Sequence, residues 1–195
     1  MKKIMLPKIA LFAAINFALS ITAIAQTNYR TQVVDIKLNG TSNLHDWQMK
    51  AVSGTSAAFF VVTNGKVTSL SKLNFSLPVK NLKSGKSGMD KNTYKALNAD
   101  ANPNISFVLT SATVVPTGGN NYKLNCQGNM SIAGKTNQTE LVATGIYNPA
   151  DKSFTVTGVK KMKMTDYNVK PPTALLGSIR TGNDITISYN LKFKA

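Results

Sequence analysis

The sequence predicts an all-β protein built from antiparallel strands, and two observations lead to this prediction. Apolar and polar positions alternate strictly in several segments, for example where Phe75, Leu77 and Val79 are interleaved with polar residues or proline. Successive strand side chains point to opposite faces, so each such segment has one apolar and one polar face. Turn residues such as Asn64-Gly65 separate the segments by short connections. The apolar faces must be hidden against a second sheet or around the sheet's own interior, and a closed barrel also removes exposed edges.

Nine segments are predicted as strands from this alternation and from the turn residues between them. They cover residues 31–40, 46–53, 57–64, 66–80, 104–115, 121–132, 136–148, 152–164 and 183–194. The connections between these segments leave no linker that would divide the chain, so we expect one domain.

Two stretches interrupt the strands. Helical spacing follows Ser87, which can cap a helix running to Leu97. Residues 165–181 are irregular because Pro171-Pro172 excludes regular ladder pairing. Leu175 and Leu176 within this stretch can plug or rim an opening.

Residues 1–25 are predicted to be a secretory signal peptide. Lys2, Lys3 and Lys8 form a basic start, an apolar run follows, and Ala23-Ile24-Ala25 is a small-x-small cleavage signal. No later stretch reaches the roughly 18 apolar residues that a transmembrane helix needs. We therefore expect an exported protein, periplasmic or secreted, whose domain covers residues 26–195.

The chain is strongly basic, with a net charge of +15, of which the three lysines of the predicted signal peptide supply three and the mature chain +12. Such a charge can attract nucleic acid or anionic membrane surfaces. Most lysines are spread along strands, which indicates a solvated face with weak attraction to anionic lipid headgroups. The tightest group, Lys160, Lys161 and Lys163, is interrupted by methionine. No aromatic and basic platform of the RNA-binding kind occurs, so nucleic acid is not an expected partner.

His45 is the only histidine, and it precedes Asp46. An Asp can orient a general-base imidazole, but consecutive side chains usually diverge and no Gly-x-Ser-x-Gly elbow supplies a nucleophile. Catalysis is therefore not expected. Two interpretations stay open for His45 and Asp46: hydrogen bonding within a turn beside a core Trp47, and contact with a ligand headgroup.

The remaining reactive residue types predict no metal or cofactor, because one histidine, one cysteine and eight scattered carboxylates lack ligand spacing. Cys126 lies on an apolar phase, which favours a buried, inert thiol. Met130, Met162 and Met164 also lie on apolar phases, where they either line a lipid cavity or pack a plain core.

Five pieces of the sequence resemble the YceI-like family, secreted lipid-binding proteins also called polyisoprenoid-binding proteins. They are residues 40–47 (GTSNLHDW), 88–90 (GMD), 102–107 (NPNISF), 128–136 (GNMSIAGKT) and 164–172 (MTDYNVKPP). The first and last are similar to a branch of the family common in Bacteroidetes-type bacteria. One departure is that no arginine precedes Asp166, where many members carry one, so no headgroup role is carried over for it.

The resemblance implies an extended, lipocalin-like antiparallel β-barrel of about eight strands with one short helix, a binding protein and not an enzyme. Its interior would hold a long isoprenoid-type lipid for carriage or sequestration. The residues expected to line that cavity are Trp47, Phe75, Leu77, Phe107, Leu109, Met130, Ile132, Met162, Met164, Tyr167, Leu175 and Leu176. An eight-stranded barrel can instead be filled by side chains, which would make a structural or interaction protein of the cell envelope without a ligand. Homo-oligomerisation is left open.

Overall fold

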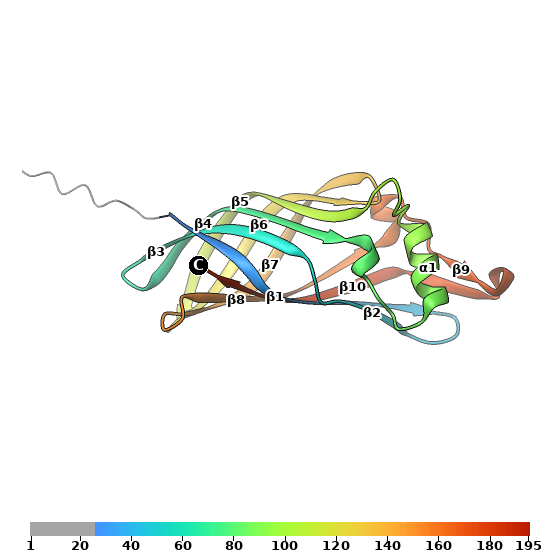
Figure 1. The fold of residues 1–195 in the computed structure, drawn as a ribbon, viewed down its shortest axis with the longest axis horizontal. Coiled ribbons are helices and arrows are strands. Elements are labelled where there is room, and N and C mark those ends of the chain that lie inside the picture. The colour runs from blue at the N-terminus through green and yellow to red at the C-terminus, as the bar shows by residue number, and fades with distance from the viewer. Residues whose placement is uncertain (1–25) are drawn as a thin grey trace, which may run out of the picture.

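Eight strands close into an antiparallel barrel in the computed structural model, which describes residues 26–195 (Figure 1). Each strand pairs with the next around the barrel, and pairing of the first strand with the last completes the ring. In order around the barrel they are β1 (Gln26–Ser42), β3 (Thr55–Thr63), β4 (Lys66–Pro78), β5 (Asn104–Gly118), β6 (Asn121–Ile132), β7 (Lys135–Asn148), β8 (Ser153–Lys163) and β10 (Ile179–Lys194). The all-β fold class and the barrel are thereby confirmed. The predicted signal peptide, residues 1–25, lies outside the described residues.

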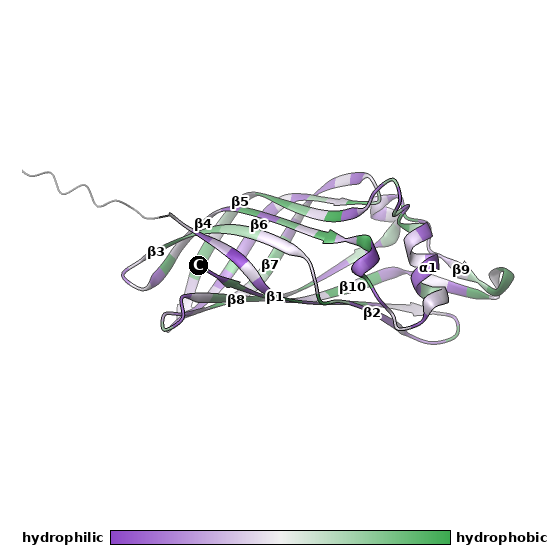
Figure 2. Cartoon of the chain, viewed as in Figure 1, coloured by the Kyte–Doolittle hydropathy of each residue, from purple (hydrophilic) through white to green (hydrophobic). Residues whose placement is uncertain are grey.

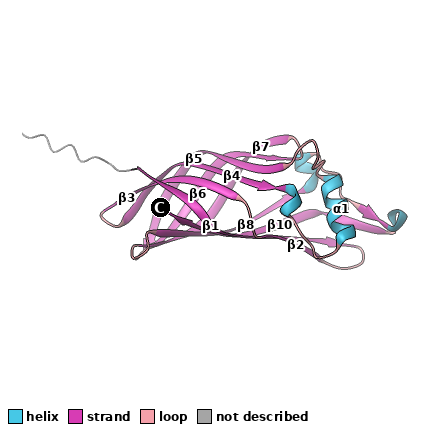
Figure 3. Cartoon of the chain, viewed as in Figure 1, coloured by secondary structure: helices cyan, strands magenta, loops and turns pink. Residues whose placement is uncertain are grey.

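Two short strands and the helical segments gather at one end of the barrel (Figure 3). The short strand β2 (Trp47–Ala51) pairs with the second half of β1, and β9 (Thr173–Ala174) pairs with the start of β10. The helical segments are α1 (Ser87–Ala96) and the 3₁₀ turns η1 (Val79–Asn81), η2 (Met164–Tyr167) and η3 (Leu175–Gly177). None of the helices within residues 26–195 is long and apolar enough to cross a bilayer.

The nine predicted strands are all present, and their ends agree with the structure to within three residues except at two of them; the short strand β9 was not predicted. β1 begins at Gln26 rather than residue 31, and β10 begins at Ile179 rather than residue 183. Both extensions lack clear alternation, but their backbones find partners, the first in β3 and the second in β9. Green and purple alternate along many of the barrel strands in Figure 2, as the two-residue period requires.

The helix starts at Ser87 as predicted, but Ser87 does not cap it. Lys86 occupies the N-cap position and makes no side-chain cap bond. Asp90 holds the first turn instead. Its Oδ1 accepts two hydrogen bonds from Ser84, one from the main-chain N at 2.8 Å and one from the side-chain Oγ at 2.7 Å. These bonds lower the pKa of Asp90, since they favour its charged form.

The β3–β4 and β7–β8 turns lie at the end of the barrel away from α1 (Figure 1). Buried aromatic side chains of this region form a cluster, here called the aromatic plug, made of Tyr29, Phe60, Tyr122, Phe154 and Phe193. The rings of Phe60 and Phe154 have centroids 4.6 Å apart, and those of Tyr29 and Phe60 pack edge to face at 5.2 Å. The hydroxyl of Tyr122 accepts a hydrogen bond from the main-chain N of Val67 at 3.0 Å. Fully buried aromatic rings therefore close this end of the barrel.

Candidate binding cavity

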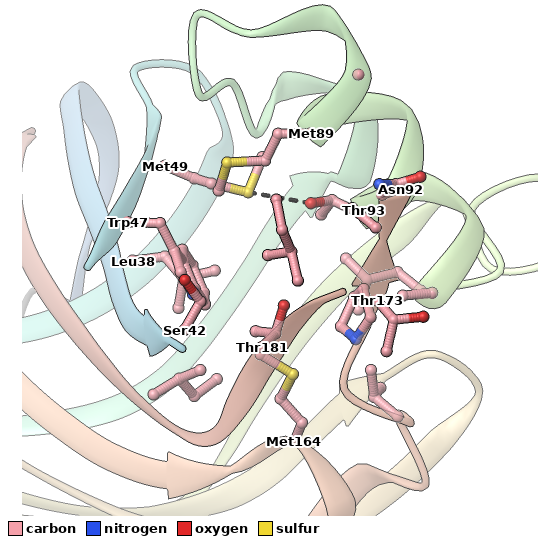
Figure 4. Close-up of a pocket in the computed structure, with 18 of the residues that line it drawn as sticks. Leu38, Ser42, Trp47, Met49, Met89, Asn92, Thr93, Met164, Thr173 and Thr181 are labelled. Carbon is pink, nitrogen blue, oxygen red and sulfur yellow. Dashed lines mark hydrogen bonds between the residues drawn. The ribbon is translucent and has the colours of Figure 1, made fainter. Parts of the chain in front are cut away.

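The end of the barrel next to α1 is open and contains a cavity of about 1050 Å³, here called the mouth. Figure 4 shows Leu38, Trp47 and Met49 on its β1–β2 wall and Thr93 of α1 on another side. The Thr93 hydroxyl donates to the sulfur of Met49 at 3.3 Å, so α1 is attached to β2. Drug-sized ligands occupy pockets of about 300 to 1000 Å³, so the mouth has the size of a ligand site.

A second cavity of about 190 Å³, the inner chamber, lies inside the barrel. Its wall is made almost entirely of apolar side chains, and the side chains with oxygen or nitrogen atoms among them are Ser106, Lys160 and Tyr189. Phe60 and Phe193 belong to both this wall and the aromatic plug. The chamber therefore ends blindly against the plug.

The mouth and the inner chamber share a boundary. Four apolar residues, one each from β1, the end of α1, β6 and β10, line both volumes; they are Leu38, Leu97, Ile132 and Ile185. A chain entering at the mouth can therefore reach the chamber along an apolar path. On β10, Ile187 and Leu191 line the chamber yet are only half-buried, which is expected of side chains that face an open lumen.

Eleven of the twelve expected lining residues lie on these walls. Those in the mouth are Trp47, Met162, Met164, Tyr167, Leu175 and Leu176, those in the inner chamber are Phe75, Leu77, Phe107 and Met130, and Ile132 lines both. Leu109 lines neither cavity and packs against the core cluster that contains the aromatic plug. A register shift between Leu109 and Ser111 moves the inward phase of β5 to Ala112 and Val114 beyond it.

His45 and Asp46 lie exposed on the turn between β1 and β2, and only His45 lines the mouth. The turn is organised by Ser42, whose Oγ accepts hydrogen bonds from the main-chain N of Leu44 at 3.2 Å and of His45 at 3.1 Å. His45 Nδ1 lies 2.7 Å from the main-chain O of Asp46. The imidazole thus contacts the carbonyl of its neighbour, which fits the structural interpretation of this pair.

Trp47 forms part of the mouth wall and is fixed at two points. Its indole Nε1 donates to the main-chain O of Thr41 at 2.9 Å, and the ring occupies the space that a Cβ would need at Gly40, its partner across the strand pair. Tyr189 occupies the corresponding space at Gly158. Glycine at these positions lets large rings lie close to the backbone of the neighbouring strand.

The groups on the chamber wall that could ionise as acids stay neutral at ordinary pH. Burial raises the pKa of the Cys126 thiol to about 11. Burial, together with the nearby Cys126, raises the pKa of Tyr189 to about 12. Cys126 is therefore an inert wall residue, as predicted, because a reactive cysteine needs an exposed thiol with a lowered pKa.

Sequence reasoning missed the position of Lys160. The sequence groups it with Lys161 and Lys163 as a basic cluster and does not predict it as a cavity residue, but Lys160 is half-buried and lines the inner chamber. Its Nζ donates a hydrogen bond to the main-chain O of Glu140 at 3.0 Å. Backbone pairing between β7 and β8 ends at Ala143 and Gly158, so this bond links the two strands past the end of their ladder. The position of Met162 could have indicated this. Met162 was expected to line the cavity, and Lys160 lies two residues before it on the same strand, so both point to the same face.

No metal centre can be built from the described part of the chain, because residues 26–195 contain no cluster of three or more His, Cys, Asp or Glu side chains. The inner chamber offers almost only apolar contact, whereas the mouth combines apolar side chains with polar and basic ones. This arrangement suits binding of an apolar molecule.

Comparisons with known proteins agree with this architecture. The structure is similar to BcnA of Burkholderia cenocepacia, at 17% identity over 82% of this chain and 95% of that chain, with a TM-score of 0.63. It is also similar to a polyisoprenoid binding domain from Saccharophagus degradans implicated in plant cell wall breakdown, at 8% identity over 86% and 98% of the two chains, with a TM-score of 0.65. The YCEI protein of Campylobacter jejuni matches at 13% identity over 72% and 81%, with a TM-score of 0.53.

These likenesses establish a shared fold, and the sequence itself carries the family assignment. A comparison with functionally curated proteins gives no match. The model of the YceI-like domain matches residues 40–193, which include every barrel strand except most of β1 and most of the residues that line the two cavities. The chain therefore belongs to the YceI-like domain family.

Proposed function

We propose that this protein binds a long apolar lipid of isoprenoid type inside its barrel and carries or sequesters it. The observation that carries the proposal is the continuous apolar path from the mouth to the inner chamber, with Leu38, Leu97, Ile132 and Ile185 common to both. A linear hydrocarbon chain fits a cavity that is wide at one end and narrow and blind at the other. The Saccharophagus degradans domain of the same fold is described as polyisoprenoid binding, which supports the choice of lipid.

The energetics favour a long chain over a short one. Each CH₂ group removed from water contributes about 0.8 kcal/mol, whereas association costs about 4 to 15 kcal/mol. A ligand of roughly 20 carbons gains on the order of 16 kcal/mol before those costs, so it binds with modest net affinity. A ligand with only a few carbons would not offset the cost of association.

The setting proposed for this activity is the periplasm or the extracellular space. Residues 1–25 have the basic start, apolar run and cleavage signal of an export signal. The pieces at residues 40–47 and 164–172 support a place in the branch of the family common in Bacteroidetes-type bacteria. We propose a binding role without catalysis, because the one imidazole, that of His45, contacts a main-chain oxygen on an exposed turn.

Trp47 provides a direct test, because it is the only tryptophan in the sequence and lines the mouth. Delipidated protein is titrated with a long-chain isoprenoid alcohol while tryptophan fluorescence is recorded, with a short-chain alcohol of the same type as control. The proposal predicts a saturable change in emission with the long alcohol and a far weaker response to the short one. Absence of any saturable response would favour the alternative, a filled barrel that acts as a structural or interaction protein of the envelope.

A further inference from the structure

Three of the most exposed large apolar side chains in residues 26–195 lie together at the rim of the mouth. Leu44 on the β1–β2 turn is 63% exposed, Leu175 in η3 is 73% exposed, and Leu176 beside it is fully exposed. All three line the mouth cavity. Figure 2 shows the tip that carries η3 in green at the far end of the molecule, beyond α1. We call these three residues the leucine rim.

The backbone of the rim is unfavourable for leucine. Leu175 and Leu176 have φ angles of +47° and +53°, in the left-handed region that Gly and Asn adopt more readily. Neither side chain packs into the core. The fold therefore presents two leucines outward, at a conformational cost, where Asn would suit the backbone better. Such unsupported strain is characteristic of functional positions.

The two loops of the rim are held to each other by Asn43. Its Oδ1 accepts a hydrogen bond from the main-chain N of Arg180 at 2.7 Å, and its Nδ2 donates to the main-chain O of Ser178 at 2.9 Å. The main-chain N of Asn43 donates to the O of Arg180 at 3.1 Å. Leu44 is thus fixed beside the hairpin that carries Leu175 and Leu176, and the rim is a preformed surface.

The charged side chains that line the mouth are all basic, although Asp46 lies exposed on the same turn as Leu44, outside the lining. Lys86, Lys91 and Lys163 line the mouth and are exposed, and no Asp or Glu is found among the described residues of its lining. Exposed leucines and exposed lysines at one opening match the boundary between the acyl chains and the anionic headgroups of a bilayer. Two copies of this face would instead oppose lysine to lysine, which disfavours a symmetric dimer through the mouth.

We propose that the mouth docks on the surface of an anionic lipid bilayer, with the leucine rim inserted at the acyl boundary and the lysines against lipid phosphates. The cavity then opens directly toward the bilayer. If the proposed lipid-binding function holds, the ligand passes between bilayer and barrel without crossing water. Docking itself needs no bound ligand, so it can be measured on delipidated protein and judged separately from lipid binding.

The first arm of the test removes the leucine rim. Delipidated protein is sedimented with vesicles of phosphatidylglycerol and phosphatidylcholine mixed in equal parts, and with vesicles of phosphatidylcholine alone. The variant Leu175→Asn/Leu176→Asn keeps the left-handed backbone and should melt no lower than wild type. Docking predicts that its partitioning onto the anionic vesicles falls by about tenfold or more.

The control for that arm is Val142→Thr/Ile146→Thr, which changes two exposed apolar residues on the outer face of β7. It should bind the vesicles like wild type. Equal binding by the wild type and the rim variant, or equal losses in the rim variant and the control, would overturn the proposal. A changed oligomeric state of the rim variant without changed vesicle binding would also overturn it and identify the rim as a protein contact.

The second arm compares two variants that each lose two positive charges. Lys86→Gln/Lys91→Gln at the mouth is compared with Lys37→Gln/Lys123→Gln on the strand walls. The mouth pair should weaken binding to the anionic vesicles by about tenfold, and the wall pair by much less, because the attraction falls off within a Debye length of the membrane. Equal effects of the two pairs would contradict docking through the mouth.

Discussion

The hydroxyl of Tyr167 lies 2.9 Å from Oγ1 of Thr139, and both residues are buried. This bond joins η2 to β7 in the region where the β7–β8 ladder has already ended at Ala143 and Gly158. Nearby, Asn137 Nδ2 donates to the main-chain O of Asp166 at 2.7 Å. Side chains therefore replace the backbone ladder on this part of the barrel wall, immediately beside the mouth.

Tyr167→Phe should lower the free energy of unfolding by about 1 kcal/mol, because it removes a buried hydrogen bond and leaves the Thr139 hydroxyl with a poorer partner. Urea unfolding of Tyr167→Phe, Thr139→Val and the double variant measures the coupling. We expect the free energy of unfolding to fall clearly less in the double variant than the sum of its decreases in the two single variants. Strictly additive losses would show that the two hydroxyls do not interact.

Filling part of the inner chamber should weaken lipid binding without unfolding the barrel. Ile105 lines the inner chamber, whereas Val108 on the same strand is exposed. Ile105→Trp should reduce affinity for a long isoprenoid alcohol by about tenfold or more, and Val108→Trp should leave it unchanged. If Ile105→Trp does not fold, Ile105→Phe, which adds less side-chain volume, takes its place in the comparison. Equal affinity in the inward and outward variants would mean that the ligand does not occupy the chamber.

The contact between Gly40 and Trp47 predicts that adding a methyl group at Gly40 lowers the stability of the protein, whereas adding one at Gly88 does not. Gly40→Ala should destabilise the protein by about 1 to 3 kcal/mol, since the new Cβ meets the indole ring. Gly88→Ala in α1 should be neutral or stabilising by up to about 1 kcal/mol, because its Cβ meets nothing. Thermal unfolding followed by circular dichroism compares the two; the same sign for both changes would be inconsistent with the packing described.

The stability of the folded protein at acid pH should depend in part on Asp151, which lies in the turn between β7 and β8. The hydroxyl of Ser153 donates to its carboxylate at 2.6 Å, and Ser153 with Lys192 lowers the pKa of Asp151 from 3.8 to about 2. Because the folded pKa lies below the unfolded value, this carboxylate stabilises the fold above pH 3.8 and the effect is lost as pH falls toward 2. The difference in melting temperature between wild type and Asp151→Asn should therefore shrink across that window. A difference that stays constant from neutral pH to pH 2 would refute this assignment.

The sequence was sufficient for the barrel strands because their residues keep a two-residue period, as β6 does from Tyr122 to Ile132. It was not sufficient where the chain breaks the period or relies on a distant partner. The register shift after Leu109 changes which residues of β5 point inward, and nothing in the local sequence marks it. Pro171-Pro172 did indicate an irregular stretch.

The candidate site was only partly predictable for the same reason. Most expected wall residues were identified because they lie on apolar phases. Lys160 was not among the expected wall residues because it is charged and was counted with the basic cluster. The left-handed backbone at Leu175 and Leu176 was not expected because leucine rarely adopts it. The hydrogen bonds between Asn43 and Arg180 join segments more than 100 residues apart in the chain. No local pattern specifies such contacts.

The central claim, that the barrel holds a long apolar lipid, is tested most directly by mass spectrometry of organic extracts from protein purified from its own host. The same extraction is applied to Ile105→Trp, whose lumen is narrowed, and to Val108→Trp, whose lumen is not. We expect one class of long-chain, isoprenoid-type lipid in the wild type and in Val108→Trp, and its depletion in Ile105→Trp. An extract free of lipid, or the same lipid content in all three folded proteins, would contradict it.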